Sequence, residues 1–416
     1  MEKTVEIKAI ASTGSGTGYV EEAGFKVPYF IPFTAPGDIV KVNVTGKKKK
    51  YVEAEIVSIV EESSNRSKVK CKHYTICGGC NLLHIDYEKQ LDYKKEILAH
   101  ILTRSGISFP KIDILSLDNP FNYRFRAKAF FECREGKLIC GFNQRRTNYA
   151  VRIEECHIVH KKILEAIKAI NRAKLSIQGR FIGTFAVNED DGAVTLDLTI
   201  DRKIPGFEAA FKGAVDEFIY RGDSQERAFN YSYVIDDEEY SLSYSSAFIQ
   251  SNLALNKKMV KAIFDCLKEQ GKQDSLADLY CGNGNLSIPL TKLFDKVDMV
   301  EGEPASFANL ERNILLNSIR NTVAHCADVQ DFVKKKFVFN TVLLDPPRAG
   351  CGEKVIESIA RWSPETIVYV SCDPVATSKE LKLLVKDKYE IDKMVLVDMF
   401  PHTNHIEFIT FMKKEK

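Results

Sequence analysis

The alternation of hydrophobic and polar positions divides the chain into three parts. In residues 1–62, five short runs alternate apolar with polar residues, and turn residues such as Pro36, Gly37 and Asp38 separate them. A period of two predicts half-buried strands, and five strands at this spacing predict a small closed β-barrel. A barrel of this size is typical of oligonucleotide-binding modules and is too short to be an enzyme.

Residues 63–242 predict a central α/β domain of mixed strands and helices. Residues 86–105 have the periodicity of an amphipathic helix that ends before Gly106. We expect this helix to belong to the central segment or to pack on the C-terminal domain.

Residues 243–416 alternate strand patterns with helix patterns, which predicts a doubly wound, Rossmann-like α/β sheet. Several predicted strands end in a polar residue, and a glycine-rich turn containing Gly282 and Gly284 follows the first of them. Ligands of such sheets bind at the carboxyl ends of the strands. The turn lacks the dinucleotide pattern GxGxxG, because Asn285, Leu286 and Ser287 follow it. The pattern therefore favours S-adenosylmethionine over a dinucleotide.

Composition narrows the class of protein but does not indicate what it binds. The 416 residues are 44% hydrophobic and 28% charged with a net charge of +2, and no run reaches the ~20 apolar residues of a membrane-spanning helix. The N-terminal residues have no secretory pattern, so we expect a cytoplasmic monomer with no membrane partner. In a reducing compartment the eleven cysteines are expected to be ligands, nucleophiles or core residues rather than disulfides.

A basic stretch in the central segment predicts contact with nucleic acid. Residues 121–152 contain eight Lys or Arg against Glu132 and Glu135, and bases alternate with aromatic or small residues over 123–130. As a strand, this stretch would oppose a charged face to an apolar one, as in proteins that bind phosphates and stack bases. The alternative is a solvated sheet face. The candidate RNA contacts are Arg124, Arg126, Lys128, Arg145 and Arg146.

Three cysteines at close spacing predict a metal or cluster site. Cys71, Cys77 and Cys80 lie in a polar, irregular segment, and two glycines between the last two free the backbone to wrap around a ligand. Cys156 is the preferred fourth ligand because its surroundings are polar, whereas Cys133 and Cys140 flank an expected turn at 135–136. A zinc site completed by one of the histidines His73, His84 or His157 remains open.

Cys372 is the candidate nucleophile. It follows an apolar strand pattern at 367–370 and precedes a helix pattern, so it is expected at the carboxyl end of a strand. A nearby helix N-terminus would favour the thiolate. The alternative is an inert core cysteine.

Together these motifs resemble the RNA (uracil-5-)-methyltransferase family. The resemblance rests on residues 247–252, 278–285, 299–303, 343–350, 370–374 and 398–407 in order, on the basic stretch, on the cysteine set, and on a barrel like the family's TRAM domain. One departure is Asp373, where the family more often has Asn. Both side chains accept hydrogen bonds from backbone, so we expect tuning of the site rather than its loss.

The resemblance implies a mechanism and its residues. Cys372 would add to C6 of uracil, C5 would take the methyl group of S-adenosylmethionine, and Glu407 would remove the C5 proton. The implied cofactor contacts are Gln250, Tyr280, Asn285, Glu301, Asp328 and Asp345. Phe248 would line the base pocket, and the set Cys71, Cys77, Cys80 and Cys156 would bind a 4Fe–4S cluster.

The expected substrate is 23S ribosomal RNA, because the barrel and the cysteine set accompany that specificity in the family. Transfer RNA is the alternative. An amino-directed methyltransferase using the aspartate–proline motif at 345–347, or a non-catalytic RNA-binding protein, would fit less of the chain.

Overall fold

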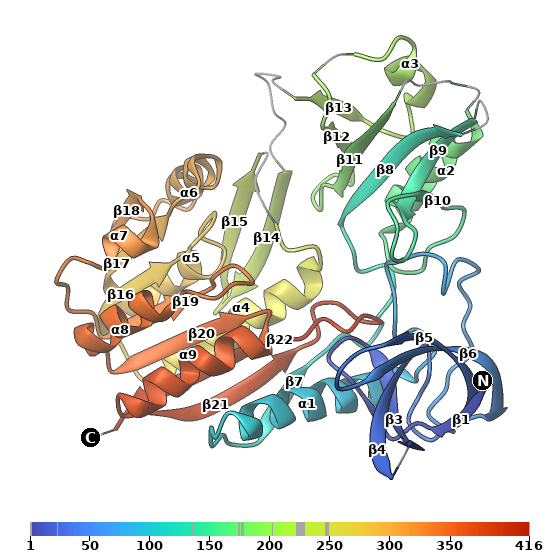
Figure 1. Cartoon of the computed structure of the whole chain (residues 1–416). Helices are drawn as coiled ribbons and strands as arrows, with labels where there is room; N and C mark the ends of the chain where they lie inside the picture. The colour runs from blue at the N-terminus through green and yellow to red at the C-terminus, as the bar shows by residue number, and fades with distance from the viewer. Residues whose placement is uncertain are drawn as a thin grey trace.

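The structure is a computed structural model that describes residues 2–22, 24–134, 137–173, 175, 179–201, 203–221, 229–245 and 249–415. The expected turn at 135–136 and Phe248 lie outside these residues. Figure 1 shows an N-terminal barrel, a central sheet and a large C-terminal sheet.

The N-terminal barrel contains the five predicted runs, the first of which is split in two. Its order is β1-β5-β6-β4-β3-β2, with β1 (Lys3–Glu6), β2 (Ala9–Ile10), β3 (Ser15–Glu22), β4 (Phe25–Pro32), β5 (Ile39–Lys47) and β6 (Val52–Glu61). Alternate residues such as Val5, Tyr29 and Val40 are fully buried inside it. The backbone closes tightly, because a Cβ on Gly18 would lie 2.2 Å from the Glu6 carbonyl oxygen.

The central sheet has the order β10-β9-β8-β11-β12-β13. Its elements are β8 (Arg126–Arg134), β9 (Lys137–Asn143), β10 (Ala150–Arg152), α2 (Lys161–Arg172), β11 (Arg180–Val187), β12 (Val194–Leu198), α3 (Phe207–Phe211) and β13 (Glu217–Tyr220). The predicted alternation in β8 is confirmed, since Ala127 and Ala129 are buried while Lys128 is exposed.

The C-terminal sheet confirms the doubly wound α/β prediction. Its order is β18-β17-β16-β19-β20-β22-β21-β7, with β7 (Ile112–Leu115), β16 (Gln273–Leu279), β17 (Phe294–Glu301), β18 (Thr322–Cys326), β19 (Thr341–Leu344), β20 (Thr366–Ser371), β21 (Tyr389–Val397) and β22 (Glu407–Lys414). Only β22 runs antiparallel to its neighbours in this part of the structure. Neighbouring residues of β16 enter different hydrophobic clusters, Leu276 on one face and Ala277 on the other, so both faces are covered.

Helices cover the two faces of this sheet (Figure 1). They are α1 (Tyr87–Arg104), α4 (Leu253–Lys268), α5 (Ser287–Leu290), the 3-10 turn η1 (Thr291–Leu293), α6 (Pro304–Leu316), α7 (Val329–Phe332), α8 (Glu353–Trp362) and α9 (Pro374–Lys386). Helix α1 packs against α9, and its Leu98 and Leu102 join the cluster that α8 and α9 form. None of the helices in the described residues is long and apolar enough to span a membrane.

A hairpin of β14 (Phe229–Ile235) and β15 (Glu238–Tyr244) belongs to the C-terminal core. Its buried Tyr231, Tyr233 and Leu242 share the hydrophobic cluster of α4 and β16. The sequence pattern predicts residues 229–242 in the central segment, because a strand pattern does not show which sheet the strands pack against.

Three asparagines of α6 hydrogen bond along the edge of β15. Their side chains accept from alternate backbone amides, Ser245 to Asn309 at 3.0 Å, Ser243 to Asn313 at 2.7 Å and Ser241 to Asn317 at 3.0 Å. The outer two donate back to the Ser245 and Ser241 carbonyls, and Asn313 donates to the Asn283 carbonyl in the glycine-rich turn. This asparagine ladder ties the hairpin to that turn.

Candidate active site

The candidate nucleophile and base lie opposite each other at the carboxyl edge of the sheet. Strands β20 and β22 are antiparallel, and Ser371 is paired with Phe408. One position further on, Cys372 follows β20 while Glu407 is the first residue of β22. Opposed residues of antiparallel strands have Cα atoms roughly 4.5–5.5 Å apart. The strand register alone therefore brings these two side chains, 35 positions apart in the chain, to one place.

The Cys372 thiol is held in its protonated form. Burial raises its pKa to about 11, the neighbouring carboxyls of Glu407 and Asp345 add to the rise, and the Arg348 guanidinium opposes it. The free amides at the N-terminus of α9 are already taken up by a carboxylate, because Asp373 accepts from the Val375 and Ala376 amides at 2.9 Å. The helix N-terminus was expected to favour the thiolate, but burial and the neighbouring carboxyls outweigh it and raise the pKa.

The carboxyls around the thiol hold their protons more strongly than ordinary ones. Burial raises the pKa of Glu407 to about 8, with Asp345 adding to it and Lys94 and Arg348 opposing. Burial also raises the pKa of Asp345 to about 7. Asp345 follows β19, whose Leu344 pairs with Tyr369 of β20. The same strand-end edge thus gathers a thiol and two carboxyls with near-neutral pKa values.

The glycine-rich turn after β16 is the candidate cradle for a nucleoside. Gly282 and Gly284 have φ of 57° and 83°, and a Cβ on Gly284 would come within 2.9 Å of Ile288 and Leu310. Glu301, at the end of β17, accepts from the Gly282 amide at 2.9 Å and from the Glu303 amide at 2.6 Å. The turn is therefore fixed by the acidic residue that was expected at ribose.

Other predicted cofactor contacts lie around this turn, and one of them, Asn285, is hydrogen bonded to other side chains of the protein. Tyr280 has a φ of +67°, and Asp328 caps α7 by accepting from the Gln330 amide at 2.7 Å. The Asn285 amide instead pairs with Asn256 of α4 at 2.8 and 2.9 Å and accepts from the Tyr231 hydroxyl at 2.8 Å.

Gln250 lies on the segment that joins the hairpin to α4. Two residues later, Asn252 caps α4 and donates to the Met399 carbonyl at 3.1 Å. This segment is therefore tied to the loop that precedes Glu407.

Two residues near the site were not predicted from the sequence. Asp278 is 1% exposed, its carboxyl oxygens have no hydrogen-bond partner among the described residues, and burial raises its pKa to about 7. Glu380 of α9 accepts from the Gly352 amide at 2.8 Å and so fixes the loop that carries Asp345 and Arg348. A charge between the apolar residues Ala277 and Leu279 was the available signal for Asp278, whereas nothing local marks Glu380.

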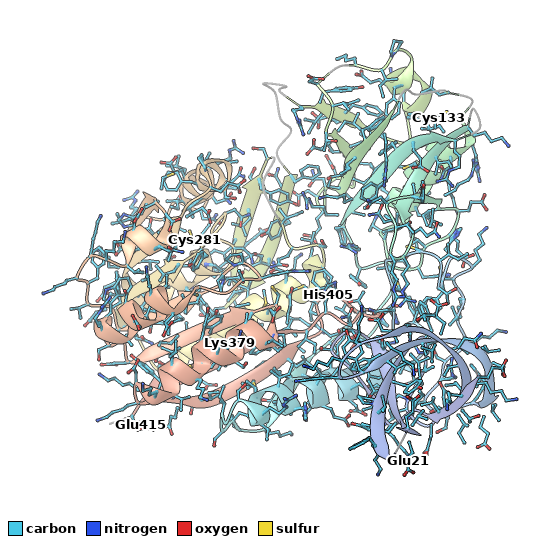
Figure 2. The ribbon with its side chains drawn as sticks, viewed as in Figure 1. Glu21, Cys133, Cys281, Lys379, His405 and Glu415 are labelled. Atoms are coloured by element: carbon cyan, nitrogen blue, oxygen red, sulfur yellow. The ribbon has the colours of Figure 1, made fainter. Side chains whose placement is uncertain are left out.

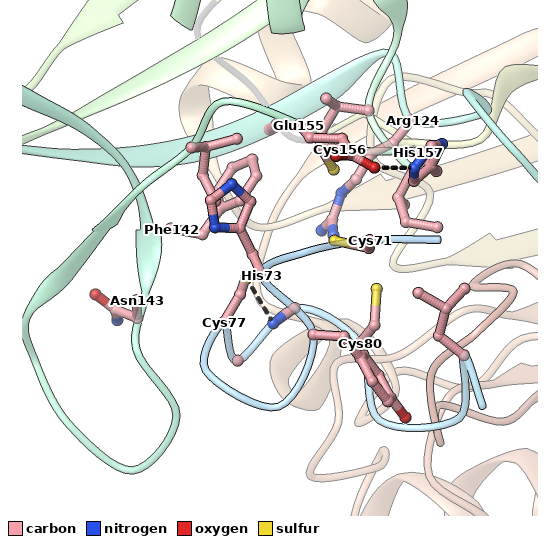
Figure 3. A pocket seen from close by; sticks show the side chains of 18 of the residues that line it. Cys71, His73, Cys77, Cys80, Arg124, Phe142, Asn143, Glu155, Cys156 and His157 are labelled. Atoms are coloured by element: carbon pink, nitrogen blue, oxygen red, sulfur yellow. Dashed lines mark hydrogen bonds and ion pairs between the residues drawn. The ribbon is translucent and has the colours of Figure 1, made fainter. Parts of the chain in front are cut away.

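The four predicted cysteine ligands line one cavity of about 250 Å³ (Figure 3). Burial raises the pKa of Cys77 to about 11, and Cys156 and Cys71 add to the rise, as charges close to one another do. No group of three or more His, Cys, Asp or Glu side chains within the described ranges is arranged to hold a metal ion. The four thiols nevertheless face a common space.

Each histidine considered as an alternative zinc ligand has one ring nitrogen in a hydrogen bond, and His73 and His157 line the cysteine cavity. His84 Nδ1 lies 2.6 Å from the Tyr74 hydroxyl, His73 Nε2 accepts from the Glu154 amide at 3.1 Å, and His157 pairs with Glu155 at 2.5 Å.

The predicted RNA-contacting bases divide into two groups. The Arg145 guanidinium stacks 4.6 Å from the ring centre of Phe33, and Arg146 lies 3.9 Å from Glu55, so both contact the barrel. Arg124 lies over Phe400 and donates to the Arg126 carbonyl, and burial lowers the pKa of Arg126. Lys128 is exposed beside the cysteine cavity.

The sheet order, the glycine cradle and the acidic strand ends define an S-adenosylmethionine-dependent methyltransferase fold. Residues 225–415 match the family described as tRNA (Uracil-5-)-methyltransferase, and residues 1–57 match the TRAM domain. The chain is 30% identical to "23S rRNA (uracil(1939)-C(5))-methyltransferase RlmD" of Francisella tularensis subsp. novicida strain U112, over 98% of this chain and 96% of the relative. It is 32% identical to the protein of the same name from Legionella pneumophila strain Lens, over 92% of each chain.

A solved structure supports the fold across the whole chain. The Pyrococcus abyssi tRNA (uracil-54, C5)-methyltransferase in complex with S-adenosyl-L-homocysteine superposes with a TM-score of 0.74, covering 98% of this chain and 99% of that chain at 23% identity. Because it is at least 30% identical to the two relatives over most of its length, the chain belongs to the RNA uracil-C5 methyltransferases. It is an enzyme that uses S-adenosylmethionine to methylate uracil in RNA.

Proposed function

We propose that this enzyme methylates C5 of one uridine in 23S ribosomal RNA through a covalent bond from Cys372 to C6. The observation that carries the proposal is the opposition of Cys372 and Glu407 across β20 and β22. A nucleophile and a base on opposite strands can act in turn on adjacent ring atoms of one flipped base. The substrate is supported by the two relatives, whose names specify 23S ribosomal RNA.

The chemistry requires that protons leave the site. When bound, S-adenosylmethionine supplies an electrophilic methyl group. Cys372 first loses its proton to water, and its thiolate then adds to C6 so that the C5–C6 electron pair makes C5 nucleophilic. After C5 is methylated, the Glu407 carboxylate takes the C5 proton, the C5–C6 double bond re-forms, and the C6–S bond breaks to release the thiolate.

We further propose that Glu301, Asp328, Asp345, Tyr280, Gln250 and Asn285 surround the methyl donor. A Cβ on Gly282 would meet no atom within 4 Å, and this open space in the turn, with the buried Asp278 carboxyl nearby, supports binding of a nucleoside with a charged amino-acid tail. Asn285 would act mainly through its bonds to Asn256 and Tyr231, which fix the turn.

A fluorinated substrate tests the covalent mechanism. RNA carrying 5-fluorouridine cannot lose a proton from C5, so the adduct should persist after denaturation with the unaltered enzyme and S-adenosylmethionine. Cys372→Ala should abolish the adduct, while Cys326→Ala, which removes an exposed cysteine at the end of β18, should not. Activity that survives in Cys372→Ala would overturn the proposal and favour an amino-directed methyltransferase.

Transfer RNA is the second candidate substrate, because the similar solved structure is a tRNA enzyme. Mapping 5-methyluridine in ribosomal and transfer RNA from a deletion strain separates the two. Loss of one ribosomal 5-methyluridine is expected, and loss confined to transfer RNA would assign the alternative.

We also propose that Cys71, Cys77, Cys80 and Cys156 hold a 4Fe–4S cluster with a structural role. Four thiols around one cavity fit the ligand set of such a cluster. Iron and sulfide analysis should find four of each per chain after anaerobic purification. Cys77→Ala should lose them and weaken RNA binding while S-adenosylmethionine binding persists, whereas Cys133→Ala should keep the cluster.

A further inference from the structure

The loop between β21 and β22, which leads into Glu407, is held by groups outside its own sheet. Gln90 of α1 is 0% exposed. Its Oε1 accepts from the His402 backbone amide at 3.0 Å, and its Nε2 lies 3.1 Å from His402 Nδ1 and donates to the Ile85 carbonyl at 2.8 Å. One buried amide thus fixes both the backbone and the ring of His402.

The cysteine-bearing segment holds the same loop from the other side. The residues directly after Cys80, Asn81 and Leu82, donate their backbone amides to the His402 carbonyl at 3.2 and 3.1 Å. The Asn81 side chain donates to Asn404 Oδ1 at 2.6 Å, and Asn404 donates to the Ser12 carbonyl of the barrel at 2.7 Å.

His402 has a conformation that these contacts must maintain. Its φ is +65°, a region that side chains other than glycine rarely adopt. Its ring stacks on Phe121 with ring centres 4.7 Å apart. A residue in this region stays there only while its surroundings hold it. Figure 2 shows His405 of this loop where the barrel, the central region and the catalytic sheet meet.

We propose that Gln90 and Asn81 are positioning residues that place Glu407 for proton removal. Glu407 is five positions beyond His402, so the rotation of the loop at His402 sets the direction from which the carboxylate enters the site. The inference rests on the proposed function, because it takes Glu407 to be the base. It makes the cysteine-bearing segment and α1 contribute to one step of the reaction.

That step is the last one, which gives the inference its own signature. Addition of Cys372 to C6 and methylation at C5 do not need the Glu407 carboxylate as an acceptor. If the carboxylate is misplaced, the C5 proton stays, the C6–S bond cannot break, and protein remains bonded to methylated RNA.

The experiment measures a denaturation-resistant adduct with ordinary uridine RNA and S-adenosylmethionine. Gln90→Met keeps the side-chain volume and removes all three hydrogen bonds, so kcat should fall about 10- to 100-fold, as misplacement by about 1 Å does. The adduct fraction should rise above that of the unaltered enzyme, and the Kd for S-adenosylmethionine should change less than twofold. Asn81→Ala, at a partly exposed position, should act in the same direction and serves if Gln90→Met fails to fold.

Two reference variants make the result decisive. Asn321→Ala removes a side chain that donates to the Thr291 and Phe294 carbonyls at 2.9 Å, far along the chain from the loop, and should leave the adduct fraction unchanged. Glu407→Gln should give the largest adduct fraction. Adduct in Glu407→Gln, but neither in Gln90→Met nor in Asn81→Ala, would overturn the positioning role and leave the proposed function standing. No adduct in Glu407→Gln would instead overturn the assignment of the base.

Discussion

Cys372 and Glu407 hold protons at neutral pH that the proposed reaction needs removed. Burial and neighbouring carboxyls raise the pKa of the thiol to about 11 and that of Glu407 to about 8, and burial raises the pKa of Asp345 to about 7. A protonated thiol is a weak nucleophile, which protects the free enzyme from oxidation and from attack on stray electrophiles. Reactivity then depends on the bound substrates.

The raised pKa values predict the pH dependence of the reaction. A complete turnover needs both the thiol and the Glu407 carboxyl deprotonated, so kcat measured over many turnovers should rise about tenfold or more per unit between pH 6 and 8. Above pH 8 only the thiol remains to ionise, so the slope should lessen. Release of methylated RNA over many turnovers across this range checks the profile, with circular dichroism to establish folding at each pH. A flat profile would contradict the assignment.

The same carboxyl predicts a pH-dependent change in stability. Glu407 has a pKa of 4.5 when unfolded and about 8 when folded, so between these values the folded state binds more protons. The free energy of unfolding contributed by this group therefore falls as pH rises from about 4.5 to 8. Glu407→Gln removes this pH dependence. The substitution should therefore raise the free energy of unfolding more at pH 8 than at pH 5, by on the order of 2 kcal/mol because the group is partly exposed. Urea titrations of both proteins at the two pH values measure it. An equal difference at both would contradict the shift.

At the residue scale, the sequence predicted that Cys372 and Asp345 lie at strand ends, because strand ends follow from hydrophobic patterns. Cys372 and Asp345 both follow apolar runs, and such positions meet at one edge of a parallel sheet. Their protonation states were not readable. They depend on Glu407 and Arg348, which approach from other strands and loops.

At the scale of elements, α1 docks on the catalytic sheet through a buried ion pair. Lys94 is 1% and Asp398 0% exposed, with Nζ and Oδ1 2.5 Å apart, and Tyr87 donates to the other carboxylate oxygen at 2.8 Å. Lys94 also donates to the Phe400 carbonyl at 3.1 Å, at the start of the loop that carries His402.

Breaking this pair should be far more costly than breaking a surface pair on the same helix. Lys94→Met leaves the Asp398 carboxylate buried without its counter-ion, and the free energy of unfolding should fall by about 3–5 kcal/mol. Lys89→Met breaks the exposed pair with Asp92 and should cost about 0.5 kcal/mol or less. Adding Asp398→Asn to Lys94→Met should restore part of the loss. Denaturant titration checks all three, and similar costs for Lys94→Met and Lys89→Met would refute the argument.

The helix itself was predictable and its partner was not. The apolar period of residues 86–105 predicts α1, but Lys94 in that pattern reads as a solvated charge. Its counter-ion lies 304 positions further along the chain. An ion pair between residues so far apart in the chain forms only once the sheet has folded, so the local sequence pattern does not predict it.

At the scale of the molecule, the bases of the central region do two different things. Arg145 stacks on Phe33 and so joins the central region to the barrel, whereas Lys128 is exposed and free to meet a phosphate. The sequence grouped them because both lie in one basic stretch. Their neighbours separate them.

Salt dependence of RNA binding distinguishes the two roles. Each neutralised phosphate of a single strand contributes about 0.7 to the slope of log K against log salt. Lys128→Ala should reduce that slope by about this amount. Arg145→Ala should weaken binding at every salt concentration through loss of domain contact, with the slope unchanged. Fluorescence anisotropy over a salt series measures both, and equal changes in slope would contradict the division.

The domain plan was largely predictable, since the barrel, the basic strand and the doubly wound sheet each follow from local periodicity. The β14–β15 hairpin was not, because its aromatic residues fit either sheet. The asparagine ladder of α6 assigns the hairpin to the C-terminal sheet. From sequence alone, a row of polar residues on a helix predicts a face exposed to solvent, because the neighbouring strand edge is not known.

That row has a built-in limit of length. Four residues of helix rise about 6.0 Å, whereas two residues of antiparallel strand span about 6.8 Å, so each successive rung drifts by roughly 0.8 Å. Three rungs stay within hydrogen-bonding tolerance and a fourth would not. Because of this mismatch in spacing, the helix and the hairpin fit together in a single alignment. The asparagine side chains also occupy amides of β15 that could otherwise pair with a strand from another molecule.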